Sequence, residues 1–159
     1  MTVREATPPA DTAALLAGAQ FADAFSLDIG GPALSARQAA ERILARPPRW
    51  TRTLLALRNL LVTPFGLKTS GARQGAQHDM IGVFPVVAES ADRLVAGFND
   101  RHLDFRVVVD VARSPDAQKV TATTLVLTHN RLGRSYLAVV RPFHRRIVPA
   151  MLRQVTAPQ

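Results

Sequence analysis

The regular alternation of polar and apolar residues over 102–113 constrains the fold more than any other feature of this sequence. The even positions carry polar side chains such as His102, Asp104 and Arg106, whereas the odd positions from 103 to 111 are all apolar. Successive side chains of a strand point to opposite faces, so this pattern predicts a long antiparallel strand with one buried face. The residues expected in that buried face include Leu103, Phe105, Val107 and Val109.

A second periodic segment, residues 132–154, predicts a long C-terminal helix. Its apolar residues recur at helical spacing and form one stripe, composed of Leu132, Tyr136, Val139, Val140, Phe143, Ile147 and Met151. Pro142 and Pro149 are seven residues apart, so they lie on one side of the helix, away from the stripe. Because an internal proline bends or breaks a helix, the segment is either one bent helix or two shorter helices that part near Pro142.

Further strands and helices are predicted around these two segments. Strand patterns cover residues 23–31, 80–90, 93–98 and 119–130. Pro85 indicates an edge position or a bulge within the second of these strands. Helix patterns cover residues 11–20, 35–44 and 49–65, and Asp11 and Ser35 are the expected N-caps of the first two. Residues 1–10 are expected to form a loose leader and residues 66–79 a loop.

This order of elements predicts one α+β domain over residues 1–159. Antiparallel strands with segregated helices define the class. The curved sheet would wrap its apolar face around the C-terminal helix, and two short helices after the first strand would close one end. The space between sheet and helix is the expected site of an apolar or amphipathic small molecule. Its expected lining is Trp50, Leu54, Leu57, Phe105, Val107, Val109, Leu125, Leu127, Tyr136, Val140, Phe143, His144 and Ile147.

Two stretches of the sequence carry a resemblance to a known family. The stretches "GFNDRHLDFR" (97–106) and "THNRLGRSYLAVVRPFHRRIV" (128–148) are similar to a bacterial family called domain of unknown function 2867. The order of elements also resembles the helix-grip fold of START-like ligand-binding proteins. In longer proteins a similar domain follows a nucleotide-binding oxidoreductase domain, which implies an accessory role beside such an enzyme. The resemblance implies no reaction and no catalytic residue.

The basic residues of the chain are concentrated in two segments. The formal net charge is +8; residues 37–73 hold eight bases and one acid, and residues 131–153 hold six bases and no acid. Arg134, Arg141 and Arg145 lie opposite the apolar stripe of the predicted helix and form a basic surface. Such a surface suits an anionic membrane or an acidic partner. Nucleic acid is disfavoured as a partner, because one Trp and one Tyr offer little stacking surface.

Two histidines are candidates for chemistry. His102, Asp104 and Arg106 share the polar face of the predicted strand, so the alternatives there are a proton relay and a solvated surface. His144 flanks the apolar stripe of the helix, where it is either a boundary residue or a group that contacts a ligand and exchanges protons. We expect no metal and no cofactor, because the sequence lacks paired histidine spacings and the glycine-rich dinucleotide fingerprint.

The composition narrows the remaining function classes. The absence of cysteine excludes disulfides, thiolate catalysis and cysteine-ligated metals. The longest apolar runs are interrupted by arginine and are shorter than the about 20 residues that span a bilayer. Pro8 and Pro9 argue against a secretory signal. A cytoplasmic location is therefore expected. Three functions stay open: a small-molecule binding module, a cyclase- or dehydratase-like enzyme that uses His144 and Tyr136 in the same cavity, and an interaction protein that works through its arginines.

Overall fold

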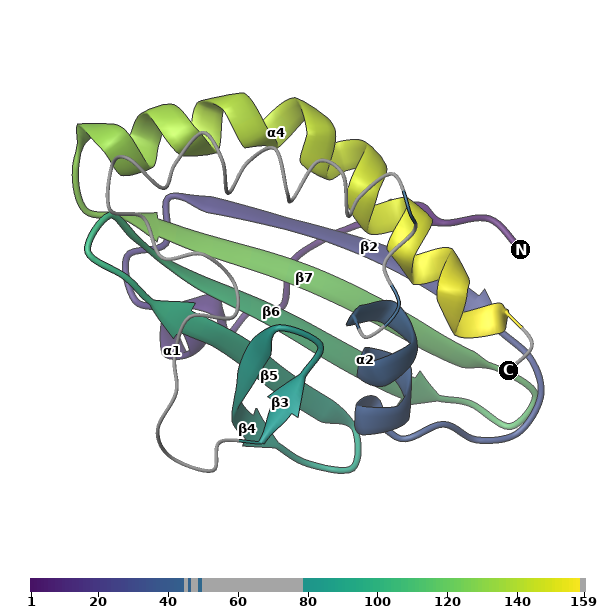
Figure 1. Ribbon diagram of the computed structural model, residues 1–159. Helices are drawn as coiled ribbons and strands as arrows, with labels where there is room; N and C mark the ends of the chain where they lie inside the picture. The colour runs from purple at the N-terminus through teal and green to yellow at the C-terminus, as the bar shows by residue number, and fades with distance from the viewer. Residues whose placement is uncertain (45, 47–48, 50–78, 158–159) are drawn as a thin grey trace.

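The computed structural model describes residues 1–44, 46, 49 and 79–157 (Figure 1). The predicted helix over 49–65 and nearly all of the loop after it therefore lie outside the described residues, as do Trp50, Leu54 and Leu57. The described strands form one antiparallel sheet in the order β1-β2-β7-β6-β5-β4-β3. Their bounds are β1 Arg4–Ala6, β2 Phe21–Ile29, β3 Met80–Ile81, β4 Phe84–Glu89, β5 Arg93–Asn99, β6 Leu103–Arg113 and β7 Gln118–Thr128. The helices are α1 Thr12–Leu15, α2 Ala36–Leu44 and α4 Arg131–Leu152, followed by the 3-10 helix η2 Arg153–Thr156.

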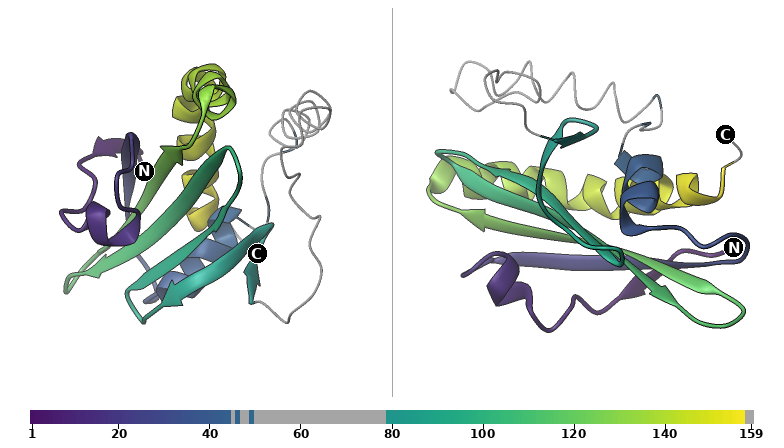
Figure 2. Two further views of the ribbon diagram at one scale, coloured as in Figure 1. Left: turned by 90° about the vertical axis from the view of Figure 1, so that its left-hand side faces the viewer. Right: turned by 90° about the horizontal axis from the view of Figure 1, so that it is seen from below.

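The alternating segment forms β6, which lies in the middle of the sheet between β5 and β7. Leu103, Val107 and Val109 are buried and Phe105 is half-buried, so the predicted register is confirmed. The other face of β6 is less exposed than the sequence suggests, because Val108 is completely buried. Figure 2 shows the reason: α1 and its flanking segments lie on one side of the sheet, and α2 and α4 lie on the other.

The two ends of the sheet differ from the expectations in detail. The expected leader is not loose throughout, because residues 4–6 form β1 and pair with β2. A short polar edge strand has no alternation long enough to be recognised. At the other end, the register shifts between Val86 and Ala88 where β4 pairs with β5, so the bulge that Pro85 indicated is present.

A reciprocal pair of hydrogen bonds begins α2. The hydroxyl of Ser35 accepts from the backbone N–H of Gln38 at 3.2 Å, and the side-chain oxygen of Gln38 accepts from the backbone N–H of Ser35 at 2.9 Å. This arrangement is a capping box, and it confirms Ser35 as the N-cap. Asp11 occupies the predicted N-cap position of α1, but its side chain makes no cap bond and instead accepts from Arg93 at 2.5 Å.

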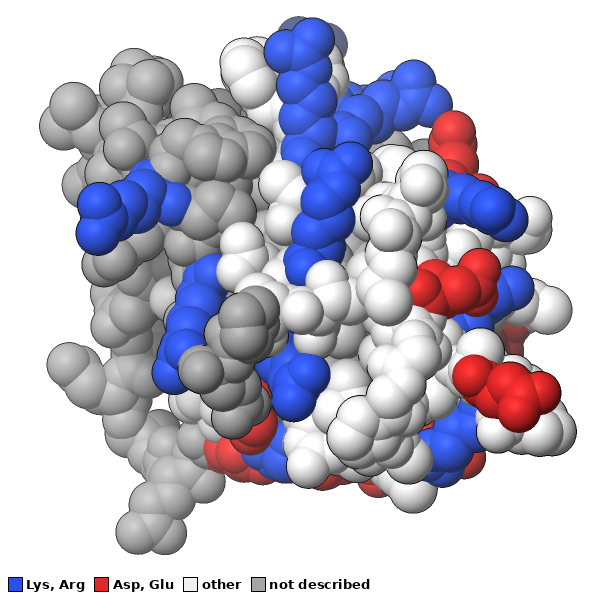
Figure 3. Space-filling view, turned by 90° about the vertical axis from the view of Figure 1, so that its right-hand side faces the viewer, with Lys and Arg blue, Asp and Glu red and all other residues white. Residues whose placement is uncertain are grey.

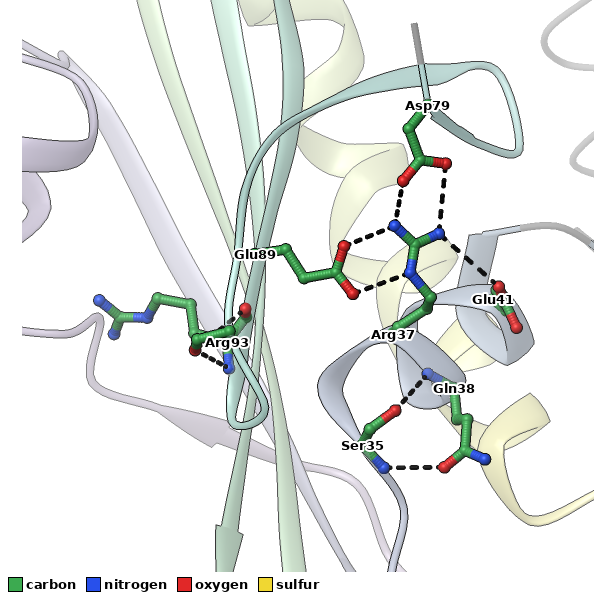
Figure 4. A network of polar contacts seen from close by, with 8 residues as sticks. Ser35, Arg37, Gln38, Glu41, Asp79, Glu89 and Arg93 are labelled. Atoms are coloured by element: carbon green, nitrogen blue, oxygen red, sulfur yellow. Dashed lines mark hydrogen bonds and ion pairs between the residues drawn. The ribbon is translucent and has the colours of Figure 1, made fainter.

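An ion-pair cluster joins α2 to the short strands β3 and β4 (Figure 4). The guanidinium of Arg37 donates to both carboxylate oxygens of Glu89, at 2.8 and 2.5 Å, and also to Asp79. These contacts cross from the helix to the edge of the sheet and fix their relative position. The small buried face of α2 consists of Ala36, Ala39, Ala40, Ile43 and Leu44.

The long C-terminal helix is continuous through both of its prolines. α4 spans 22 residues, and Pro142 and Pro149 lie inside it. Figure 1 shows that α4 bends toward its C-terminal end, so the bent single helix is the correct alternative. Asn130 caps its N-terminus, where the side-chain oxygen accepts from the backbone N–H of Gly133 at 2.9 Å.

The main core lies between α2, the C-terminal part of α4 and one end of the sheet. Its buried members include Leu27, Leu94, Val109 and Val120 from the sheet and Leu152 from α4. This part of the fold is closed by packing. On the rest of this sheet face, polar and aromatic side chains lie close together.

Candidate functional site

The candidate site is the sheet face on the same side as α4, which itself packs against β2 and β7 of that face. Residues that oppose each other across antiparallel strands share one face, so the strand register defines rows of side chains on it. One row runs across β2, β7, β6 and β5 through Asp23, Thr124, Val107 and Ala96. The next row runs through Phe21, Val126, Phe105 and Phe98. The face therefore carries an acidic residue, Asp23, on β2 and aromatic residues, Phe98 and Phe105, on β5 and β6.

An aspartate and a histidine form a pair at the polar end. His144 Nδ1 lies 2.9 Å from Asp23 Oδ2, and the two side chains are only 15% and 13% exposed. The ring of Phe21 lies edge-on to the imidazole, with centroids 5.7 Å apart. The pair links α4 to β2 across 121 positions of sequence, and it holds the imidazole in a fixed orientation.

The chemistry of the pair follows from its hydrogen bond. An ionised carboxylate only accepts, so His144 Nδ1 carries the proton and donates to Asp23. The other ring nitrogen, Nε2, is then available to accept a proton or a hydrogen bond when the imidazole is neutral. Asp23 Oδ1 is buried and has no partner among the described residues, so the pair has unused acceptor capacity on both of its members.

Three phenylalanine rings form the aromatic end. The ring centroid of Phe84 lies 5.3 Å from that of Phe105 and 6.3 Å from that of Phe98, and the centroids of Phe98 and Phe105 are 5.7 Å apart. All three residues are half-buried. They combine a preorganised apolar surface with room for further contact.

Two predicted lining residues lie on the wrong face of the sheet for this site. Leu125 opposes Arg106, and Leu127 opposes Asp104, so both side chains point to the face that carries α1. Leu125 is completely buried there. Phe105, Val107 and Val109 do lie on the face beneath α4, as predicted, although Val109 belongs to the closed core.

The rotation of α4 differs from the predicted one. Val139 and Phe143 are 65% and 49% exposed, so the prediction that Phe143 belongs to the face of α4 buried against the sheet is wrong. The face that α4 turns to the sheet is displaced by roughly 60° around the helix from the apolar stripe, at 3.6 residues per turn. It carries Gly133, Tyr136, Leu137, Val140, His144, Ile147, Val148, Met151 and Leu152, of which Gly133 and Leu152 are fully buried and the others half-buried.

Two contacts account for this rotation. A Cβ built on Gly133 would lie 2.1 Å from the carbonyl oxygen of His102. Only glycine at position 133 therefore lets the first turn of α4 approach the β5–β6 hairpin this closely. The His144–Asp23 pair fixes the helix about three turns later. His144 therefore faces the sheet, and the adjacent Phe143 does not.

His102 and His129, the two other histidines among the described residues, serve the framework. The amide of Asn130 is oriented by its cap bond, so its nitrogen lies 2.8 Å from His102 Nδ1 and donates to it. His129 pairs with Asp104 at 2.9 Å. The hypothetical relay of His102, Asp104 and Arg106 is not formed, because Arg106 donates instead to the carbonyl oxygens of residues 98 and 105.

The predicted basic residues of α4 lie at the surface. Arg134, Arg141 and Arg145 are all exposed, and Figure 3 shows Lys and Arg side chains in a column that runs from the top to the middle of one end of the molecule. A groove of about 360 Å³ runs beside α4, and it brings two of these arginines together with residues of the sheet edge. Its lining is Gln20, Thr128, Arg134, Leu137, Ala138 and Arg141.

Sequence reasoning did not find Asp23, Asn130 or Gln20. Asp23 begins a predicted strand, and its partner is distant in sequence, so no local pattern marks it. Asn130 directly precedes the apolar-periodic segment, which is the usual signature of an N-cap. Within the residues that the structure describes, no cluster of three or more His, Asp or Glu side chains could hold a metal ion. No described helix is both long and apolar enough to cross a membrane.

The model of the family described as protein of unknown function (DUF2867) matches residues 15–151 of the chain. No curated protein matches it. A solved structure of a conserved protein from Geobacillus kaustophilus is similar over 85% of this chain and 92% of its own, with 8% sequence identity and a TM-score of 0.41.

Proposed function

This chain belongs to the DUF2867 family of proteins of unknown function, and we propose that it binds an amphipathic small molecule on the sheet face beneath α4. The family assigns no ligand, so the proposal depends on the residues of that face. The observation that carries it is the change of chemistry across a single face. The Asp23–His144 pair lies at one end, and the cluster of Phe84, Phe98 and Phe105 lies at the other.

The aromatic end would take the apolar part of the ligand. The three rings are half-buried, so part of their surface is still in contact with water. Covering apolar surface contributes about 25 cal/mol per Å². The rings already contact one another, so they lose little side-chain freedom when a ligand binds.

The polar end would take a hydrogen-bond donor of the ligand. Asp23 Oδ1 is buried without a partner, and His144 Nε2 faces away from the bond that orients the ring. A hydroxyl or amine could donate to either atom, whereas a hydrocarbon could donate to neither. The proposed ligand therefore has an apolar body and a donor at one end.

A cyclase- or dehydratase-like enzyme is the second candidate, and the same pair favours it. A carboxylate that orients a histidine is a common arrangement for general acid–base catalysis. In such a reaction His144 Nε2 would accept a proton from the bound molecule, and Asp23 would stabilise the imidazolium that forms. Conversion of the bound compound, abolished in His144→Gln, would distinguish the enzyme from the binding module.

Native mass spectrometry of the full chain purified from cells tests the proposal. We expect a small molecule that remains bound under native conditions and is released on denaturation. Phe105→Ala should reduce its occupancy, and Phe143→Ala is the matched control, because it removes the same side chain from the exposed side of α4. Asp23→Asn should also reduce occupancy, whereas His129→Gln should not. A chain that carries no small molecule, and that gains no thermal stability from a set of amphipathic compounds, would contradict the proposal.

A further inference from the structure

We propose that the groove beside α4 is a second binding site, selective for an organic oxyanion that carries an apolar substituent. This groove is lined by Gln20, Thr128, Arg134, Leu137, Ala138 and Arg141. None of these residues belongs to the aromatic cluster or to the Asp23–His144 pair. The site is therefore independent of the function proposed above.

Two arginines supply the positive charge of the groove. Arg134 and Arg141 are seven residues apart, which places them on one side of α4 and about 10 Å apart along its axis. Neither forms an ion pair with a carboxylate in the described part of the chain, whereas Arg145 in the same row lies 3.4 Å from Glu5. The groove is thus lined by two guanidinium groups that form no ion pair among the described residues. Such a pair of positive groups favours an anionic ligand.

Arg141 is held in place by an aromatic ring. Its guanidinium carbon lies 5.4 Å from the centroid of Phe21, and Phe21 is itself packed edge-on against His144. This cation–π contact restrains the guanidinium through its flat face. The N–H groups at its edge stay available, so the ligand would meet a donor that is already positioned.

Gln20 adds a further donor with a defined orientation. The backbone N–H of Thr128 donates to Gln20 Oε1 at 2.9 Å, and the hydroxyl of Thr128 donates to the same oxygen. A backbone N–H cannot accept, so these contacts identify the bonded atom as the oxygen and leave the NH₂ group of Gln20 for another partner. The polar lining thus consists mainly of donors and contains no carboxylate, which calls for a ligand rich in acceptors.

The remaining lining is apolar and small. Leu137 is half-buried, and the methyl group of Ala138 leaves space between the two arginines. A volume of about 360 Å³ is near the lower end of the range for small-molecule sites. These properties indicate a phosphate or carboxylate group bound by the arginines and Gln20, with an alkyl substituent against Leu137 and Ala138.

Isothermal titration of the full chain with octyl phosphate, below its aggregation concentration, tests the inference. Octyl phosphate should bind, and octanol, which has the same chain without the charge, should not. Arg134→Gln combined with Arg141→Gln should weaken binding by about 10-fold or more. The matched control is Arg101→Gln with Arg153→Gln, which removes the same charge from two other exposed arginines and should leave binding unchanged.

Ala138→Leu tests the groove without changing the charge. The larger side chain should fill the space between the arginines and weaken binding, and because Ala138 is exposed, this variant should fold normally even if the double arginine variant does not. Equal weakening in the test and control double variants would overturn the inference in favour of general electrostatic attraction. Binding to phosphatidylglycerol vesicles, without binding to octyl phosphate, would overturn it in favour of a membrane surface. Binding that is lost in Phe105→Ala and kept in Ala138→Leu would assign the ligand to the sheet face instead.

Discussion

At the scale of single residues, the carboxylate of Asp23 indicates where the molecule is suited to bind something. One of its oxygens accepts from His144, and the other is buried with no partner in the described structure. Leaving a buried polar atom unpaired costs about 1–3 kcal/mol. A ligand that donates to this oxygen would recover that cost on binding. His102 Nε2 is also buried and has no partner in the described structure. The other ring nitrogen, Nδ1, accepts from the side chain of Asn130, which is the N-cap of α4.

Neighbouring residues of α4 should respond to truncation in a way that the apolar pattern does not suggest. Leu152 is completely buried, so Leu152→Ala should lower the free energy of unfolding by about 2–5 kcal/mol. Phe143 is 49% exposed, so Phe143→Ala should lower it by less than about 1 kcal/mol. Urea unfolding followed by circular dichroism measures both changes. Losses of similar size would mean that Phe143 is packed in the core and that the rotation of α4 described above is incorrect.

At the scale of elements, the sequence predicts what depends on local periodicity. The alternation in 102–113 identifies β6 and its register, because a slip of one residue would move its apolar set to the opposite face of the sheet. The segment around Leu125 and Leu127 has apolar or small residues on both faces, so its pattern does not say which face meets α4. Periodicity also predicts the length of α4 but not its rotation, which is decided by Gly133 and by the His144–Asp23 pair, both contacts with distant segments.

The contact between α2 and the edge of the sheet should depend on pH. The hydrogen bonds from Arg37 lower the pKa of Glu89 below its ordinary value of 4.5. A carboxylate with a lowered pKa in the folded state contributes stability above its ordinary pKa, and that contribution is lost as the pH falls through the lowered value. Glu89→Gln should therefore lose less stability than the wild type when the pH is lowered below about 4.5, as measured by urea unfolding at a series of pH values.

Glu41→Gln is the control for this measurement. Glu41 also approaches Arg37, but at 3.9 Å and across one turn of the same helix, so it does not join α2 to the sheet. The expected profile of this variant is that of the wild type. A Glu89→Gln profile identical to the wild type would mean that the ion pair between α2 and β4 contributes nothing measurable, as many exposed pairs do.

At the scale of the whole molecule, the distribution of charge is the dominant feature. The net charge is +8, and α4 carries five arginines and no acid. Several of the described acids are paired with arginines outside α4, for example Asp79 and Glu89 with Arg37. The excess charge therefore lies in two parts of the chain, α4 and residues 37–73, which hold eight bases and one acid. It attracts anions, and its like charges repel one another.

The thermal stability of the chain should consequently rise with moderate salt. Repulsion among like charges destabilises the compact state, and the screening length falls from about 30 Å at 0.01 M salt to about 10 Å at 0.1 M. Salt also weakens the exposed ion pairs, but each contributes only about 0–1 kcal/mol, so relief of repulsion should prevail and the Tm should increase over this range. Arg134→Gln with Arg141→Gln reduces the net charge from +8 to +6 and should show a smaller increase, as measured by scanning calorimetry in sodium chloride. A Tm that decreases with salt in both proteins would mean that the ion pairs of Arg37, Arg93 and Arg113 outweigh the repulsion along α4. In that case the arginines of α4 would not destabilise the fold.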